Sequence, residues 1–283
     1  MNMNELPDVV CIGSAALDLV FLLDDFPSPD QISLAKWCKQ FCGGSSANVS
    51  VGLSRLGVYS GLISKVGKDA EGVLLLNTLV SEGVDVRAVK ISGKTGRTVV
   101  LLTETGEKAI IADTQCVLKT ENELPKWYLS KAKAVYIGDC FLPVAEKAIE
   151  LARKFKILTF CRLRNVSSGL HFEKIISQAD FVIMNEKTHS LLGDTYENFV
   201  ITKGSRGCSY VREDILIDGI KVDSIDTTGA GDAFCAGFIY QIVKGNSVKE
   251  ALQFANRAGA VSTTKYGAMD SMPSRTEVES LFQ

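Results

Sequence analysis

Strand-like and helix-like segments alternate along most of this 283-residue chain, and this alternation limits the possible folds more than any other feature. Residues 8–13 form a short apolar run that ends in glycine, as a buried strand of a parallel sheet does. Residues 44–57 then show apolar positions at helical spacing, with serine near the start and glycine at the end. Further strands are expected at 59–67, 132–139, 156–161 and 180–185, and further helices at 70–83, 142–155, 171–178 and 186–193. The sequence therefore predicts an α/β fold with three layers, in which helices cover both faces of a doubly wound, mostly parallel sheet.

Two segments interrupt the alternation. Residues 18–41 and 93–113 are typical of consecutive short strands joined by turns, with no helix between them. After residue 193 the chain continues with a strand pair at 198–204 and 207–213 and with two helices within 233–267. We expect a single domain over residues 1–283, in which the two interrupting segments form a small β lid.

The composition excludes several classes of protein. The chain has 31 Lys and Arg against 33 Asp and Glu, so its net charge of −2 does not favour nucleic acid or an anionic membrane as partner. No uncharged apolar run reaches the length of a membrane span, and residues 1–10 lack the basic start of a signal peptide, which predicts a cytoplasmic protein. The eight cysteines lie mostly in apolar runs, so we expect buried, reduced thiols. The Lys94-Thr95 pair is no Walker motif, because position 88, where the first glycine would fall, is alanine.

Residues 226–234, Asp-Thr-Thr-Gly-Ala-Gly-Asp-Ala-Phe, combine an anion site with a carboxylate. Gly229, Ala230 and Gly231 precede an apolar helix, so their N–H groups and the helix dipole favour a negatively charged ligand. In a site that served only to bind phosphate, the negative charge of Asp232 would repel the ligand. Phosphoryl transfer, however, needs both a cradle for the phosphate and a base for the attacking hydroxyl.

A second polar group is expected at the carboxyl edge of the predicted sheet, where ligands of such folds bind. Residues 43–48 read Gly-Gly-Ser-Ser-Ala-Asn, and Asp18 follows the first strand. Asp18 and Asn48 together offer acceptors and a donor for hydroxyl groups. An ordinary helix start, capped by Ser45 or Ser46, explains residues 43–48 equally well.

Residues 43–57 and 226–238 resemble the two signature regions of the ribokinase-like (PfkB) carbohydrate kinases, in the same order along the chain. The resemblance covers nearly the whole chain and implies a kinase that uses ATP and Mg²⁺. Asp232 would then be the general base, and the amides of Gly229, Ala230 and Gly231 would form the anion hole.

The same resemblance assigns binding roles by position. It implies an acceptor site, a nucleotide site and a candidate site for a monovalent cation such as K⁺. The acceptor residues would be Asp18, Gly43, Gly44 and Asn48; the nucleotide residues Asn185, Thr202, Gly204, Gly207 and Asn256; and the cation residues Asp226, Thr228, Thr263, Gly267 and Ser271.

Two departures from the family pattern bear on the site. The family has Asn-x-x-Glu where this chain has Asn185 and Thr188, which leaves Glu186 as a candidate to replace the missing acid. Arg162 and Arg164 stand where relatives have Asp-Pro or Asp-x-Asn-x-Arg. These arginines could face an acidic or phosphorylated substrate, but surface or ion-paired arginines are more common.

The resulting hypothesis is an ATP-dependent kinase that phosphorylates a hydroxyl of a small sugar or nucleoside, with a neutral acceptor favoured. Ribose, fructose, 2-keto-3-deoxygluconate and nucleosides stay open as acceptors. The alternative is a non-catalytic regulatory protein of the same fold that binds a nucleotide or a sugar. The lid strands carry apolar residues at 20–22 and 99–102 that we expect to be exposed, which predicts a homodimer formed through the lid.

Overall fold

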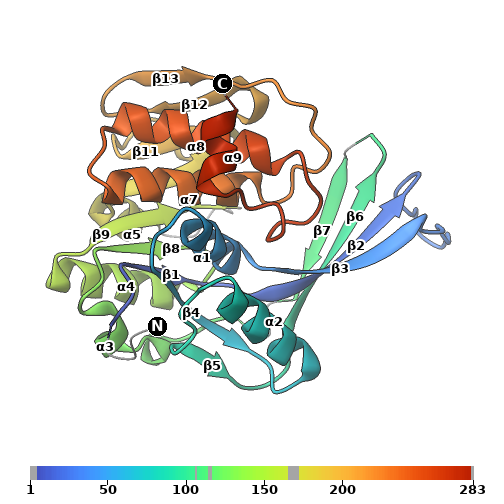
Figure 1. Ribbon diagram of the computed structural model, residues 1–283, viewed down its shortest axis with the longest axis horizontal. Helices are drawn as coiled ribbons and strands as arrows, with labels where there is room; N and C mark the ends of the chain where they lie inside the picture. Colours follow the sequence, from blue (N-terminus) through green and yellow to red (C-terminus); the bar gives the residue numbers. More distant parts are fainter. Residues whose placement is uncertain (1–4, 106, 114–116, 165–171, 282–283) are drawn as a thin grey trace.

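The computed structural model describes residues 5–281 except 106, 114–116 and 165–171, and it confirms the α/β fold. Its main sheet has nine strands in the order β13-β12-β11-β10-β9-β8-β1-β4-β5 (Figure 1). Neighbouring strands are parallel from β11 to β5, whereas β12 runs antiparallel to both of its neighbours. The strands are β1 (Val9–Ile12), β4 (Ser60–Val66), β5 (Val89–Ile91), β8 (Ala134–Ile137), β9 (Leu158–Arg162), β10 (Phe181–Asn185), β11 (Phe199–Thr202), β12 (Gly207–Tyr210) and β13 (Ile215–Asp218).

Helices cover both faces of this sheet because successive strand residues point to opposite sides. Val9 and Cys11 pack with residues of α1, α2, α7 and α8, whereas Val10 and Ile12 pack with residues of α3, α4 and α5. The α-helices are α1 (Ser45–Arg55), α2 (Ala70–Ser81), α3 (Lys126–Leu129), α4 (Leu142–Phe155), α5 (Glu173–Gln178), α6 (Glu186–Leu192), α7 (Ala230–Val243), α8 (Val248–Ser262) and α9 (Arg275–Ser280), and the 3₁₀ turns are η1 (Glu121–Glu123) and η2 (Gly204–Arg206). The sequence prediction missed the short elements β5, β13, α3 and α9, which carry too few residues for a periodic signal.

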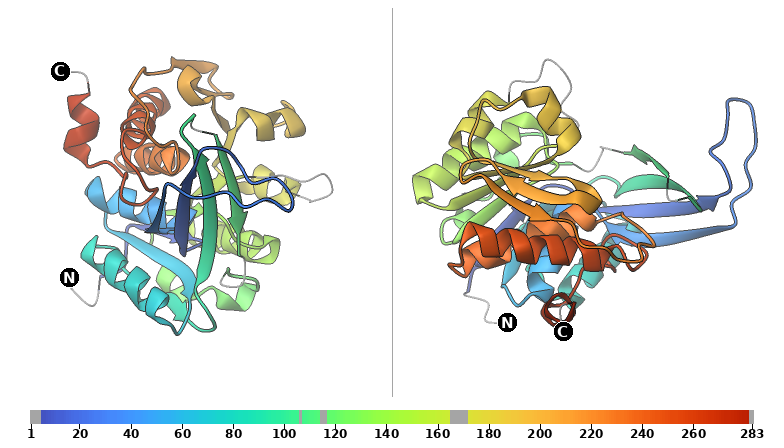
Figure 2. Two further views of the ribbon diagram at one scale, coloured as in Figure 1. Left: turned by 90° about the vertical axis from the view of Figure 1, so that its right-hand side faces the viewer. Right: turned by 90° about the horizontal axis from the view of Figure 1, so that it is seen from above.

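The two segments that interrupt the alternation form a second sheet of four strands in the order β3-β2-β6-β7. This small sheet extends away from the three-layer body, as the view from above shows (Figure 2). Its central pair, β2 and β6, is parallel, and each of these strands pairs antiparallel with an edge strand. The strands are β2 (Ala16–Leu23), β3 (Trp37–Gly43), β6 (Gly96–Thr103) and β7 (Lys108–Ala112).

The expectation that the apolar side chains at 20–22 and 99–102 of the small sheet are exposed was wrong, because three of them are buried and the other four are half-buried. Val20, Val100 and Leu102 are at most 5% exposed. They form one cluster with partly buried neighbours from β2 and β3, because alternate residues of these strands share one face of the sheet. Exposed apolar surface lies instead on the edge strand β7, at Ile110 and Ile111.

The cysteines within the described part of the chain are all free thiols. Cys11, Cys161, Cys208 and Cys235 are buried as expected, Cys42 and Cys140 are partly buried, and Cys38 is exposed. Cys116 and His171 lie outside the described residues. None of the described helices is both long enough and apolar enough to cross a bilayer.

Candidate active site

The turn before α7 leaves backbone N–H groups free at the carboxyl edge of the main sheet. Gly229 is the N-cap of α7 and has a φ of 86°, and a Cβ there would lie 2.9 Å from the Cα atom of Ala268, so only glycine fits. The N–H of Ala230 donates to the carbonyl of Thr227 at 3.3 Å, and that of Asp232 donates to the carbonyl of Gly229 at 2.8 Å. Within the described chain, no residue accepts a hydrogen bond from the N–H groups of Gly229 or Gly231. Of the three amides predicted to form an anion hole, these two are available to an anion.

The carboxylate of Asp232 lies in the first turn of α7 and is buried, with 3% of the residue exposed. Its Oδ1 atom accepts hydrogen bonds from Ser45 Oγ at 2.8 Å, from Arg164 Nη2 at 2.6 Å and from Arg162 Nη1. Its Oδ2 atom accepts one, from Asn48 Nδ2 at 2.8 Å. Since each carboxylate oxygen has about two lone-pair positions, only Oδ2 has room for another donor.

Burial by itself would raise the pKa of Asp232, because it disfavours the charged form. The positive charges of Arg164 and Arg162, helped by the hydrogen bonds from Asn48 and Ser45, outweigh burial and hold the pKa of this carboxyl below its usual value. Asp232 is therefore ionised at neutral pH.

Asn48 connects this carboxylate to the predicted acceptor site. The residue is 2% exposed, and its side-chain Oδ1 is a buried acceptor for which the described residues provide no donor. Buried acceptors are seldom left unpaired, because the lost hydrogen bond with water costs about 1–3 kcal/mol. A hydroxyl group of a ligand would donate the missing hydrogen bond to Asn48 Oδ1.

Asp18 faces the same space, but it lies on β2 of the small sheet and not at the end of the first strand of the main sheet. Gly43 pairs with Ala16, which lies two residues before Asp18 on β2. A Cβ atom at Gly43 would overlap the Asp18 carboxylate. Burial, together with the nearby charges of Asp232 and Asp226, raises the pKa of Asp18 to about 6, although the side chain of Thr98 hydrogen bonds to it.

The alternative reading of residues 43–48 as a side-chain-capped helix start was wrong. Gly44 is the N-cap of α1, with a φ of 94°, and no side chain caps this helix. The hydroxyl of Ser45 donates to Asp232, and that of Ser46 donates to the carbonyl of Ile12. Both serine hydroxyls therefore hydrogen bond to residues distant in the sequence and not to the N–H groups at the start of α1.

Two cavities meet at this turn. The first has a volume of about 710 Å³ and lies between the carboxyl edge of the main sheet and the small sheet. Its lining includes the predicted base Asp232 and three of the four predicted acceptor residues, Asp18, Gly44 and Asn48, whereas Gly43 is not part of it. The small sheet contributes Thr98, Val100 and Lys108 from β6 and β7 as one wall.

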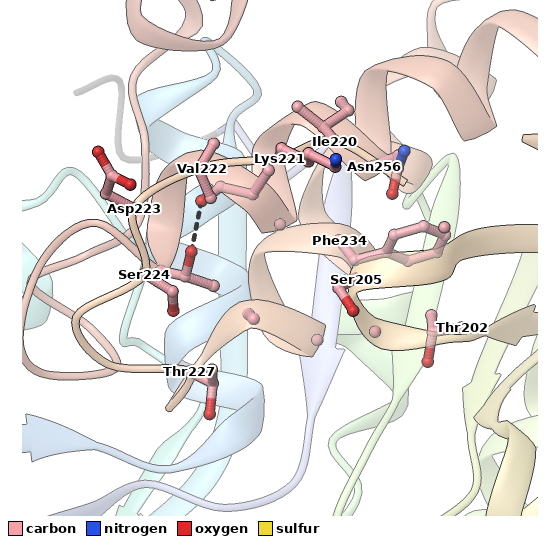
Figure 3. A pocket seen from close by; sticks show the side chains of 17 residues that line it. Thr202, Ser205, Ile220, Lys221, Val222, Asp223, Ser224, Thr227, Phe234 and Asn256 are labelled. Carbon is pink, nitrogen blue, oxygen red and sulfur yellow. Dashed lines mark hydrogen bonds between the residues drawn. The ribbon is translucent and has the colours of Figure 1, made fainter. Parts of the chain in front are cut away.

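The second cavity has a volume of about 800 Å³ and lies on the other side of the turn. Four of the five predicted nucleotide residues line it: Thr202, Gly204, Gly207 and Asn256. Figure 3 shows Phe234 and Asn256 reaching it from α7 and α8, together with Ile220 and Val222 from the segment after β13. Thr202, Thr227 and Gly231 line both cavities, so a ligand in the second cavity can reach the first at Gly231.

Asn185, the fifth predicted nucleotide residue, lines the first cavity and not the second. Its Oδ1 atom caps α6 by accepting from the N–H of Thr188 at 2.8 Å. Thr188 is buried at 4% exposure, and Glu186 forms an ion pair with Arg206. The residues at this corner therefore provide no unpaired carboxylate for Mg²⁺.

The five residues predicted to bind a monovalent cation are brought together by the structure beside the turn. Asp226 is buried and accepts from the N–H of Thr228 at 2.8 Å and from that of Gly267 at 3.1 Å. The carbonyl of Thr263 accepts from the N–H of Asp226, and the N–H of Ser271 donates to the carbonyl of Gly267. This gathers carboxylate, carbonyl and hydroxyl oxygens, the ligand type that hard cations prefer.

Sequence reasoning missed two polar residues of the site. Ser45 was taken for a cap, and Lys108 was not considered, although its Nζ atom donates to Thr227 Oγ1 at 3.1 Å. Strand alternation places Lys108 on the same face of β7 as Ile110, but the sequence does not reveal that this face lines the cavity. Arg162 and Arg164 are ion-paired, and their partner is the predicted base itself.

Comparison with known proteins identifies the family of this chain. A family model described as pfkB family carbohydrate kinase matches residues 6–275. The chain is 32% identical to the probable chloroplastic fructokinase-6 of Arabidopsis thaliana, over 97% of this chain and 82% of the relative. It is 28% identical to the ribokinase of Bacillus subtilis, over 97% and 99%. Its fold is similar to that of an Arabidopsis thaliana ribokinase complexed with ribose and ATP, with a TM-score of 0.83, 23% identity and coverage of 98% and 99%.

Proposed function

The chain belongs to the pfkB family of carbohydrate kinases, and on that premise we propose that it transfers the γ-phosphate of ATP to a hydroxyl of a small sugar or nucleoside, with Asp232 as general base. One observation carries this proposal. A buried carboxylate and two unbonded N–H groups lie together at the start of α7, where two cavities meet. This arrangement lets one ligand present a phosphate to the amides while another presents a hydroxyl to the carboxylate.

The second cavity suits the nucleotide. Its side-chain lining combines apolar groups, such as Ile220, Val222 and Phe234, with Thr202 and Asn256, as a base and a ribose require. A nucleotide in this cavity would direct its phosphates towards Gly231, which both cavities share. The free amides of Gly229 and Gly231 would then hold the negative charge of the transferred phosphoryl group.

The first cavity suits the acceptor. Asp18, with Thr98 beside it, and the unpaired Oδ1 atom of Asn48 would accept hydrogen bonds from hydroxyl groups of the acceptor. The reacting hydroxyl would donate to Asp232 Oδ2, the carboxylate oxygen with room for a further donor. As its oxygen attacks the γ-phosphorus, the proton passes to Oδ2 and the bond to the bridging oxygen of ADP breaks. We propose a neutral sugar as the acceptor, in line with the fructokinase and ribokinase among the relatives.

Two ions belong to the proposal. Mg²⁺ would bind together with the phosphates of the nucleotide. At the start of α6, Thr188 has no carboxylate and that of Glu186 is ion-paired with Arg206, so neither residue provides a free carboxylate ligand. When bound, this ion neutralises phosphate charge. A monovalent cation would bind among the oxygens of Asp226, Thr228, Thr263, Gly267 and Ser271 and keep the turn before α7 in place.

The small sheet would act as a lid, since it forms one wall of the acceptor cavity and would exclude water from the reaction. It also carries the proposed dimer contact. No described strand pairs with the outer side of its edge strand β7, which also carries the exposed side chains of Ile110 and Ile111, at 52% and 66% exposure. Light scattering that gives the mass of one chain at micromolar concentration would contradict the dimer.

The test of the proposed function is a coupled ATPase assay over a panel of sugars and nucleosides. We expect turnover with at least one of them, and a loss of about 10²- to 10⁴-fold in kcat for Asp232→Asn, because the base is removed. Asp25→Asn, at an exposed position of the small sheet's long loop, is the matched control and keeps full activity. Full activity of Asp232→Asn would refute the base, and nucleotide binding without any turnover would favour the regulatory alternative.

A further inference from the structure

Two arginines, Arg162 and Arg164, hydrogen bond to the proposed base Asp232. Arg162 is the last residue of β9, and Arg164 follows two positions later, just beyond the end of the strand. Both bind the same oxygen, Oδ1 of Asp232. A carboxylate that neutralises two guanidinium groups is a weak proton acceptor, because protonation would leave both charges without their partner.

The same arginines lie where the transferred phosphate would arrive. A Cβ atom at Gly231 would overlap Nη2 of Arg162, so this guanidinium lies directly against the turn that carries the free amides. Arg162 is 13% exposed at its side chain and Arg164 is 40% exposed, and both line the first cavity. Lys108 approaches the turn from the small sheet, through Thr227. Three cationic groups thus surround the place for a phosphate.

A terminal phosphate is a stronger partner for these arginines than the carboxylate is. Guanidinium groups bind phosphate oxygens through two parallel hydrogen bonds, and the terminal phosphate of ATP carries more negative charge than one carboxylate. Arg162 uses only its Nη1 atom for hydrogen bonds within the described residues, and Arg164 only its Nη2 atom. Nη1 of Arg164 also lies 3.9 Å from Oδ2 of Asp139, an ion pair too long for a hydrogen bond, so the remaining hydrogen-bond donors of both groups are available to a second anion.

We propose that Arg162 and Arg164 hold Asp232 as an ion-paired carboxylate until the nucleotide binds, and that they then move to its terminal phosphate, which releases the base for the acceptor hydroxyl. This inference rests on the proposed function and adds a positioning role for both arginines. The exchange makes base release depend on the phosphoryl donor. In the reaction that follows, the acceptor oxygen bonds to the γ-phosphorus, the bond from that phosphorus to the bridging oxygen breaks, and the electron pair leaves with ADP. The hydroxyl proton goes to Asp232, while the arginines stay on the transferred group.

Binding of nucleotides, without any acceptor, tests the exchange. In the wild type, the terminal phosphate must displace Asp232 from the two arginines, so part of its binding free energy is lost. Asp232→Asn removes the competitor and keeps the side-chain shape. We therefore expect this variant to bind the analogue AMP-PNP about ten-fold more tightly than the wild type does. ADP lacks the terminal phosphate, so its affinity should change less than about two-fold.

A double-mutant cycle separates this exchange from simple repulsion between Asp232 and phosphate. The cycle combines Asp232→Asn with Arg162→Gln and Arg164→Gln, and isothermal titration measures AMP-PNP and ADP for every variant at one Mg²⁺ concentration. Without the arginines, the gain from Asp232→Asn should fall below about two-fold, since there is no pair left to break. Arg212→Gln, at an exposed position that lines neither cavity, is the control and leaves both affinities unchanged.

Simple repulsion between Asp232 and the terminal phosphate acts whether or not the arginines are present. It therefore predicts that Asp232→Asn tightens AMP-PNP binding in the arginine variants too. A gain that persists or grows in the arginine variants would therefore overturn the proposal, and so would a gain of the same size for ADP. If Arg162→Gln does not fold, as judged by circular dichroism, the cycle is run with Arg164→Gln alone, whose side chain is more exposed, and a coupling above about two-fold is still expected. Kinase activity of the wild type is measured separately, so the proposed function can stand when this inference fails.

Discussion

The replacement Asp18→Asn should stabilise the protein at alkaline pH while it weakens acceptor binding. Asp18 is 7% exposed, and burial raises its pKa to about 6 from an ordinary value of 3.8. The folded protein therefore binds the Asp18 proton more tightly than the unfolded chain does. Ionisation of this carboxyl above its folded pKa opposes folding, and asparagine removes that cost because it is neutral at every pH.

The size of the effect follows from the two pKa values. Each pKa unit corresponds to about 1.4 kcal/mol, so at pH 8 the ionised Asp18 lowers the free energy of unfolding by about 3 kcal/mol. The loss begins as pH rises through about 4 and is complete above about 6. At pH 4.5 we therefore expect a difference of only about 1 kcal/mol between the variant and the wild type. At about 2 °C per kcal/mol, the melting temperature of the variant should be about 6 °C higher at pH 8.

Urea titrations followed by circular dichroism at pH 4.5 and pH 8 measure this difference. Asp25→Asn, at an exposed position, is the matched control and should change stability by less than about 0.5 kcal/mol at either pH. A difference that is the same at both pH values, or a variant less stable than the wild type at pH 8, would refute the reasoning. The same variant should raise KM for the acceptor, since asparagine has one acceptor oxygen in place of two, as expected where a site trades stability for binding.

Three further experiments test two residues of the site and the burial of two cysteines. Asn48→Ala removes the hydrogen bond to Asp232 and the unpaired oxygen, so initial-rate kinetics should show a higher KM for the acceptor and, by comparison, little change in KM for ATP. Gly231→Ala places a Cβ against Arg162, so kcat should fall about 10²-fold while thermal melting shows that the fold is kept; an unchanged kcat would argue against phosphate binding at this turn. Iodoacetamide at pH 8 should label the exposed Cys38 well before Cys235, because burial raises the pKa of the latter to about 11; mass spectrometry of peptides would reveal the reverse order.

The sequence by itself determined the layers of the fold and the chemistry of the turn before α7. Apolar strand segments that alternate with amphipathic helices can bury their side chains only in a sheet that helices cover on both faces. Gly229, Gly231 and Asp232 are neighbours in the chain. Their relation to one another is therefore local, and local geometry follows from residue type. The small sheet was also predicted, because its turns break the helical pattern at 18–41 and 93–113.

Only the tertiary structure decided what surrounds Asp232. Ser45, Arg162 and Arg164 are separated from it by between 68 and 187 positions, and pairs so distant leave no periodic signal in one sequence. Serine before a helix indicates a cap, and arginine after a strand indicates a solvated side chain, unless the fold brings a buried carboxylate within reach. Asp18 acquires its raised pKa in the same way, from burial between two sheets. Charge and burial at this site are properties of the packed molecule, because both depend on which distant segments exclude water from the carboxylates.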